Sequence, residues 1–476
     1  MLGLFGTLSL ANRSLQTQRN GTEVAGHNLA NVNTAGYARQ RVAIETSLTI
    51  PSDMGPQGTG ADAVGIYQLR DALLDRQIVS ETSVRGAYES RQQALQFGQA
   101  ALGQQIDRQA TGAEGAAAAS GVGGQHGIAE YLSDMFNAMQ SLSANPTSVS
   151  ERQALVTNAQ SLATQFNQVS ARLDDLRASL SDSLESDVEQ ANIALKDIAK
   201  LNEQIIAAEL GTTAKANDLR DVRQKRIEEL AELVRVETTA NTNGSIDIAV
   251  DGVTLVSGPN VEDTLETYDA GGGQFLVRTS TGGTSLNLAG GSMQGTIDAR
   301  DSDLLNLQTD LNTLAGTLIS EINAVHAGGY GLGGTTGAAF FTGTDASDIA
   351  VNTALADDPT LVQASGVSGA VGDNSVIVRM AQLADQTNAG LNGETFSEFY
   401  GQAVTALGQA LNGTNTQLAN QEIVESMLQR QRDSVSGVSL DEEMTDLIKF
   451  QRGFEASAKL ITTIDEMLET VINLKR

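Results

Sequence analysis

Two amphipathic segments stand at the ends of this chain and enclose a glycine-rich, acidic middle. At the N-terminus, small and apolar residues recur in steps of three and four, namely Leu4, Leu8, Ala11, Leu15, Ala25 and Leu29. This spacing predicts a helix that ends near residues 31–33. Apolar stripes at both ends are the layout of a subunit that polymerises through its termini.

The C-terminal segment, residues 436–474, carries a wider apolar stripe. Its members are Leu440, Met444, Leu447, Phe454, Ala458, Ile461, Ile464, Leu468, Val471 and Ile472. Ser439 followed by Glu442 is the pattern of a capping box at the start of a helix. One partner helix cannot cover so wide a stripe. We therefore expect the two terminal helices to pair and to leave apolar surface for neighbouring copies.

Isolated helix pairs of this size are marginal in water. We therefore expect poorly ordered termini in a free monomer, with residues 1–35 and 440–476 unprotected from hydrogen exchange and residues 150–235 protected. Ordering on assembly would then couple folding to polymerisation. The alternative is an intramolecular bundle core that covers the stripes within one chain.

Helical spacing dominates the middle of the chain. Residues 162–205 keep three-and-four spacing throughout and predict a rod of roughly 60 Å or more. Further helices are expected at about residues 69–106, 217–234 and 301–326, and again from about residue 376 onward.

Four other parts of the middle are not helical in pattern. Alternating runs around a Pro/Gly-rich loop predict a β-hairpin near residues 41–67, and a switch to period two predicts a small β insert at residues 238–296. Residues 111–127 have the composition of a flexible connector, and residues 331–372 that of a glycine-rich irregular segment. The prediction is a mainly α fold with a β insert.

Composition excludes several classes of partner. The chain has 58 acidic and 30 basic residues, a formal charge of −28, which argues against nucleic acid or an anionic membrane as a partner. It has no cysteine, so neither a disulfide nor a thiolate metal site can form. No apolar run approaches the roughly 18 residues that span a bilayer. The N-terminus has no basic residue before its apolar stretch, so we expect any export to proceed without a cleaved signal peptide.

No constellation for catalysis stands out. The three histidines, His27, His126 and His326, are scattered, and residues 329–334 match GxGxxG but follow a predicted helix rather than a strand. Asp298, Asp301 and Asp303 lack the glycine and glutamate of a calcium loop, so we expect them to favour the start of the next helix, although weaker calcium binding stays open. We predict no catalytic, cofactor-binding or metal site, and no enzyme.

A short motif follows the first helix, at Ala30, Asn31, Thr34, Gly36 and Tyr37. Gly36 can adopt a positive φ and turn the chain toward the hairpin, with the Tyr37 ring lying back against the helix end. Together with the C-terminal segment, this motif resembles the signature of the bacterial flagellar rod, hook and hook-associated protein family. Ala35 stands where many members carry Pro or Asn.

Three internal stretches extend the resemblance: DLRDVRQKRIEELAELV from Asp218, INAVHAGGYGLGGTTGAAFF from Ile322 and SEFYGQAVTALG from Ser397. The first two are similar to family members at the junction between hook and filament, and rod and hook proteins lack them. The resemblance implies a structural subunit of that junction. The alternatives are a hook or distal rod subunit, or a secreted adhesin or enzyme on a flagellin-like scaffold.

The resemblance also implies an architecture. It consists of a terminal coiled-coil domain D0 (residues 1–35 and 437–476), a long-helix domain D1 (residues 36–237, 297–330 and 373–436) and a small outward β domain D2 (residues 238–296). The implied partners are further copies in a helical ring, hook protein on one side, and the second junction protein and filament on the other. An export chaperone at the C-terminal helix and the flagellar type III export apparatus are also implied, with an extracellular location.

Overall fold

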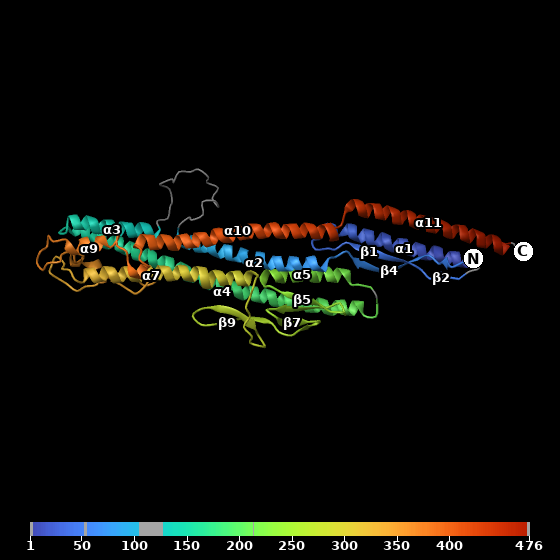
Figure 1. The fold of residues 1–476 in the computed structure, drawn as a ribbon, viewed down its shortest axis with the longest axis horizontal. Coiled ribbons are helices and arrows are strands. Elements are labelled where there is room, and N and C mark those ends of the chain that lie inside the picture. The colour runs from blue at the N-terminus through green and yellow to red at the C-terminus, as the bar shows by residue number, and fades with distance from the viewer. Residues whose placement is uncertain (1–2, 52–54, 104–126, 213, 474–476) are drawn as a thin grey trace.

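The molecule is long and thin, and both chain ends lie at the same tip (Figure 1). The structure is a computed structural model that describes residues 3–51, 55–103, 127–212 and 214–473. At the tip, helix α1 (Leu4–Ala30) packs against helix α11 (Leu440–Asn473). The predicted pairing of the terminal helices is therefore confirmed.

The predicted β-hairpin lies on the other side of α1. Strand β1 (Gln40–Thr46) pairs antiparallel with β4 (Ala61–Gln68), and the short strands β2 (Thr49–Ile50) and β3 (Gln57–Gly58) extend the ribbon. Thr17 of α1 donates a hydrogen bond to the Ala61 carbonyl at 3.0 Å. The first helix thus lies between the hairpin and α11.

Helices, most of them long, form the body of the molecule. They are α2 (Ala72–Ala101), α3 (Ile128–Ala144), α4 (Val149–Glu209), α5 (Asn217–Leu233), α7 (Leu304–His326), α9 (Ser375–Gln382) and α10 (Phe396–Ser436). The 61 residues of α4 span about 90 Å. This confirms the predicted rod. The helix begins at Val149, before the predicted residues 162–205, because Ser148 caps it by accepting a hydrogen bond from the Glu151 amide at 3.2 Å. Apart from Gly127, the predicted connector lies outside the described residues.

Two hydrophobic cores follow one another along α4. Leu155, Leu162 and Phe166 belong to the first core, which also takes in α3, α7, α9 and α10. Leu195 and Ile198 belong to the second, with α5 and the β insert. One helix therefore joins both ends of the body rigidly.

The β insert packs on the C-terminal half of α4 (Figure 1). Its strands are β5 (Glu237–Ala240), β6 (Ile246–Val250), β7 (Val253–Ser257) and β8 (Asn260–Val261), in one sheet, and β9 (Leu265–Asp269) with β10 (Phe275–Thr279), in a second. Two buried or half-buried amides of α4 fix its position. Asn192 exchanges two hydrogen bonds of 2.8 Å with the Leu265 backbone, and Asn202 donates to the Ile246 carbonyl at 2.8 Å.

The glycine-rich segment folds onto the first core. It holds strands β11 (Phe341–Thr342) and β12 (Ala350–Val351) and the short helix α8 (Thr353–Asp357), with Phe340 and Phe341 buried. The GxGxxG match is a loop, as predicted: a Cβ on Gly331 would lie 2.9 Å from the Thr360 carbonyl oxygen. Burial lowers the pKa of His326 to about 4, and its ring contacts the Ala338 carbonyl. This histidine therefore serves packing.

The prediction for the aspartate cluster was wrong. The helix does not begin at Asp301, since α6 (Ser292–Asp298) runs through a π-helical turn (Ala299–Asp303) directly into α7. Asp303 accepts two hydrogen bonds from Arg91, at 2.8 and 3.0 Å, and Asp301 pairs with Arg300 at 2.7 Å. The carboxylates therefore meet guanidinium groups in mid-helix rather than a helix start. Within the described residues no group of three or more His, Cys, Asp or Glu side chains could hold a metal.

The approach of α6 to α2 gives a test of the fold. A Cβ on Gly295 would lie 2.1 Å from the Ala87 carbonyl oxygen, whereas a Cβ on Gly413 of α10 meets nothing within 4 Å. Gly295→Ala should therefore lower the free energy of unfolding by about 1–3 kcal/mol. The control Gly413→Ala should raise it by up to about 1 kcal/mol. Chemical denaturation of both variants checks this, and an equal effect of the two would contradict the packing.

Candidate assembly site at the joint of the terminal helices

The chain passes between the terminal helices and the body at one place. The Arg39 amide donates a hydrogen bond to the Ser436 carbonyl at 2.8 Å, and the Arg39 carbonyl accepts one from the Leu69 amide at 2.8 Å. Backbone hydrogen bonds thus join three segments of the chain here, at Arg39, Leu69 and Ser436. We call residues 28–40, 217–221 and 436–446, with Arg70, the polar joint.

Asn28 lies at the centre of the polar joint and is only 1% exposed. Its amide nitrogen donates to the Gln40 carbonyl at 2.8 Å and to the Glu443 carboxylate at 3.0 Å. Its oxygen accepts from the Gln40 amide at 3.0 Å and from the Tyr37 hydroxyl at 2.8 Å. One buried side chain therefore connects α1, β1 and α11. Its removal would leave the groups that bond to it without these hydrogen bonds.

Arg39 supplies the charge that balances the start of α11. Its side chain is 7% exposed, its Nε lies 2.5 Å from Oε1 of Glu443, and its Nη1 pairs with Glu442. Glu443 is itself buried, so this carboxylate depends on Arg39 and Asn28 for compensation. The prediction of a capping box between Ser439 and Glu442 was wrong, because the Glu442 side chain pairs with Arg39 instead.

The family motif forms the turn that was predicted. Gly36 has φ +79°, a conformation that strains residues with a Cβ. The Tyr37 ring lies 5.7 Å from the His27 ring, and its hydroxyl is 2.9 Å from His27 Nδ1. Thr34 closes the preceding loop by donating to the Asn31 side chain at 3.2 Å. Ala30 ends α1, so the motif is the corner between α1 and the hairpin.

Helix α5 supports the polar joint from the body. Asp218 accepts a hydrogen bond from the Gln40 side chain at 2.8 Å, and Asp221 accepts one from the Ala38 amide at 3.1 Å. Burial raises the pKa of Asp221 to about 6, although the charge of Arg70 and the Ala38 amide act in the other direction. An aspartate in an unfolded chain titrates near 4. The contribution of Asp221 to stability is therefore fully present below about pH 4 and lost as the pH rises through about 6.

Small residues bring α1 and α11 close together. A Cβ on Gly21 would lie 2.6 Å from the Phe450 ring, and one on Gly453 would lie 2.7 Å from Gln18. Further along, the hydroxyls of Ser14 and Ser457 are 2.9 Å apart. The seam between the helices is therefore partly polar and built on glycine.

The predicted apolar stripes divide between this seam and the surface. Buried members are Ala11, Ala25 and Ile464; partly buried members are Leu4, Leu8, Leu15, Leu29, Leu447, Ala458, Ile461 and Leu468. Exposed members are Leu440 at 51%, Met444 at 49%, Phe454 at 37%, Val471 at 54% and Ile472 at 69%. Rows spaced by seven drift about 20° per heptad around a straight helix, so they cannot all stay on one seam.

Sequence reasoning missed the polar members of the site. Asn28, Arg39 and Glu443 break the apolar pattern, and polar residues carry no weight in a heptad argument. The signal available was the pair Arg39-Gln40 directly after the motif, together with acidic residues at the start of α11.

Comparisons with known proteins agree with this geometry. The family model described as the flagellar hook-associated protein FlgK helical domain matches residues 121–341, and that of the flagellar basal body rod FlgEFG protein C-terminal region matches residues 429–474. Flagellar hook-associated protein 1 of Bacillus subtilis is 27% identical, covering 99% of each chain. The same protein of Salmonella typhimurium is 24% identical, covering 98% of each.

A solved structure shows a similar fold. It is described as the flagellar hook junction protein FlgK from Burkholderia pseudomallei and superposes with a TM-score of 0.64 at 15% sequence identity. The likeness covers 76% of this chain and 100% of that one.

The Arg39–Glu443 pair provides a test of the polar joint. Arg39→Met leaves a buried carboxylate unpaired, which costs about 3–5 kcal/mol. Hydrogen exchange of residues 38–40 and 436–446 should therefore accelerate by about a hundredfold or more. The double variant Arg39→Met with Glu443→Met should recover much of the protection. The control Arg19→Met, which removes an exposed pair with Glu23 at 2.8 Å, should change little, and a variant of Arg39 that behaves like this control would refute the role of the pair.

Proposed function

Because this chain belongs to the family of flagellar hook-associated protein 1, we propose that it is built into the flagellum as a structural subunit between hook and filament, held there by its paired terminal helices. The observation that supports attachment through these helices is the outer face of α11. That helix has one long partner, α1, yet Leu440 at 51%, Met444 at 49% and Phe454 at 37% remain exposed on one side of it. We call Leu440, Met444 and Phe454 the exposed row. Exposed apolar side chains gathered on one side of a helix are typical of an interaction site.

A row of this kind suits contact between unlike faces of neighbouring copies. Such heterologous contacts build rings or helical assemblies rather than closed dimers. The match of the basal body rod C-terminal model to residues 429–474 supports the same mode of attachment, since α11 is the part shared with the rod and hook proteins. We propose further copies of the chain as lateral partners, hook protein on one side, and the second junction protein and filament on the other.

We propose a terminal domain of residues 1–35 and 437–476, with the polar joint as its boundary. Residues 238–296 would form the outward β domain, and residues 36–237, 297–330 and 373–436 the helical domain.

The exposed row also requires cover before assembly. We propose that an export chaperone binds α11 and that the flagellar type III apparatus exports the chain, without a cleaved signal peptide, to the outside of the cell. No helix in the described residues has the length and hydropathy needed to cross a membrane.

The alternative of a hook or rod subunit has less support. Full-length similarity is to hook-associated protein 1, and the rod model matches only the last helix and the end of α10. We propose no catalytic role, since the family consists of structural proteins of the flagellum.

Phe454 tests the exposed row. Phe454→Asp should leave helicity and melting near those of the wild type, because the side chain is 37% exposed and the new carboxylate can reach water. It should nevertheless abolish incorporation, because an unpaired charge in an interface between copies costs about 3 kcal/mol or more. Complementation of a strain that lacks the gene, with assay of filament protein leaked into the medium, measures this.

The matched control is Thr463→Asp, nine residues along α11 and thus on about the opposite face. It adds the same charge at an exposed position and should support normal filaments. Normal filaments with Phe454→Asp would exclude the row as the site of attachment.

Gly36 tests the corner between α1 and the hairpin. Gly36→Val should strain the turn by about 1–3 kcal/mol, since valine rarely adopts φ near +79°. Helicity of the isolated protein should stay near normal, but the N-terminal helix would be misaimed and incorporation should fail. Gly36→Asn is the control, because asparagine tolerates this φ better. Equal assembly of the two variants would contradict the turn argument.

A further inference from the structure

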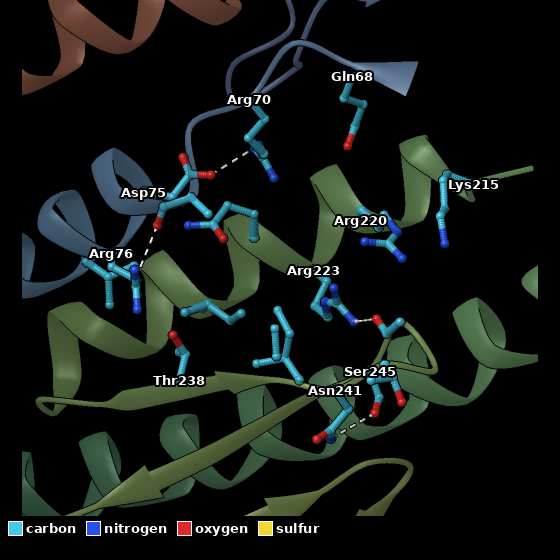
Figure 2. A pocket seen from close by; sticks show the side chains of 18 residues that line it. Gln68, Arg70, Asp75, Arg76, Lys215, Arg220, Arg223, Thr238, Asn241 and Ser245 are labelled. Atoms are coloured by element: carbon cyan, nitrogen blue, oxygen red, sulfur yellow. Dashed lines mark hydrogen bonds and ion pairs between the residues drawn. The ribbon is translucent and has the colours of Figure 1, made fainter. Parts of the chain in front are cut away.

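A cavity of about 570 Å³ lies between α2, α5 and the turn that joins β5 to β6 (Figure 2). The residues that line it include Arg70, Arg76, Lys215, Arg220 and Arg223. No residue of this group belongs to the exposed row of α11. The cavity is therefore a feature separate from the proposed contacts of the terminal helices.

Positive charge in the cavity exceeds the nearby negative charge. Five cationic side chains line it, against one lining carboxylate, Asp75. Two further carboxylates pair with cations from behind: Glu209 with Lys215 at 3.2 Å and Arg220 at 2.8 Å, and Asp221 with Arg70 at 3.4 Å. Even with both included, two positive charges stay uncompensated, in a chain whose formal charge is −28.

Arg223 is the most buried of the five, at 3% exposure. Its Nη1 donates to the Asn202 side chain at 2.7 Å and to the Gly244 carbonyl at 2.8 Å, which are both neutral acceptors. Its buried Nε has no hydrogen-bond partner within the described protein. Burial and, after it, the charge of Arg220 lower the pKa of Arg223 to about 10, and the charge of Glu209 acts in the other direction. The guanidinium is thus hydrogen-bonded by neutral groups alone, and the nearby carboxylate of Glu209 already pairs with Lys215 and Arg220.

Arg76 and Lys215 lie at the exposed side of the same cavity. Arg76 is exposed and its Nε donates only to the Ala72 carbonyl, at 3.3 Å, in its own helix. Lys215 and Arg220 both pair with the Glu209 carboxylate, and Arg220 donates two hydrogen bonds to it. Burial raises the pKa of Glu209, but these hydrogen bonds outweigh burial and lower the pKa to about 2. The rim therefore offers two exposed cations beside the buried Arg223.

We propose that this cavity binds an oxyanion, with Arg223 beneath it and Arg76 and Lys215 at its rim. Planar guanidinium groups bind carboxylate and phosphate oxygens through paired hydrogen bonds, and a half-enclosed site strengthens each contact. Two sources share this chemistry: free phosphate, and the carboxylate of an acidic side chain on a neighbouring copy in the assembled junction. The second source rests on the proposed function, whereas the first does not.

Titration of the full chain with inorganic phosphate, at constant ionic strength set with chloride, tests the site. Isothermal calorimetry should give a Kd in the millimolar range, on the order of 1 mM. Arg76→Gln with Lys215→Gln should weaken binding by about tenfold or more, since two charge-assisted contacts are lost. Both side chains are exposed, so the fold should be kept, with circular dichroism as the check.

The control is Arg226→Gln, on a neighbouring face of α5, where Arg226 pairs with Glu229 at 2.7 Å and does not line the cavity. It should bind phosphate like the wild type. Equal weakening by Arg226→Gln would mean a general charge effect and would overturn the site.

Carbodiimide coupling of assembled protein, mixed from ¹⁴N- and ¹⁵N-labelled copies, distinguishes the two sources. An isotope-mixed cross-link between Lys215 and an acidic residue, suppressed by added phosphate, would identify the neighbouring copy as the source. Phosphate binding without this cross-link would identify a free anion. Neither binding nor cross-link would refute the oxyanion site while leaving the junction role intact, because assembly itself is scored by the α11 variants.

Discussion

The buried contact between Arg39 and Glu443 is the interaction on which the arrangement of the terminal helices depends. Arg39 follows the turn after α1, and Glu443 lies in the first turn of α11, so this ion pair joins residues more than 400 positions apart in sequence. Asn28 binds both the strand after Arg39 and the carboxylate of Glu443. Because each group is buried and depends on the others, the geometry has few alternatives of similar energy.

This polar joint explains how the same helices can be fixed at one end and available at the other. Near Asn28 the pair is held to the body by α5 and by the hairpin. Toward the tip the seam relies on glycine and serine contacts, and the outer face of α11 stays apolar and exposed. The joint thus sets the direction of the pair, and neighbouring subunits would cover its outer face. Any mobility of the free termini should therefore grow with distance from Glu443.

Much of the fold could be predicted from the sequence because long helices and alternating strands leave strong periodic signals. The α4 rod, the hairpin, the β insert and the paired ends all follow from spacing, and the positive φ of Gly36 follows from its place between helix and strand. The start of α6 could not be predicted, since Gly291, which precedes it with φ 85°, reads as part of a glycine-rich loop. The polar joint could not be predicted either. Its members come from four distant segments, and only folding brings their complementary groups together.

Distance measurement between spin labels tests the polar joint most directly. The chain contains no cysteine, so Lys225→Cys on α5 and Lys449→Cys on α11, both at exposed positions, can be labelled specifically. In the free monomer this pair should give one narrow distance distribution, and Arg39→Met should broaden that distribution. A second pair, with Glu469→Cys in place of Lys449→Cys, should give a broader distribution even when Arg39 is present. A distribution for the first pair that is equally broad with and without Arg39 would contradict the claim that this buried ion pair fixes the terminal helices to the body.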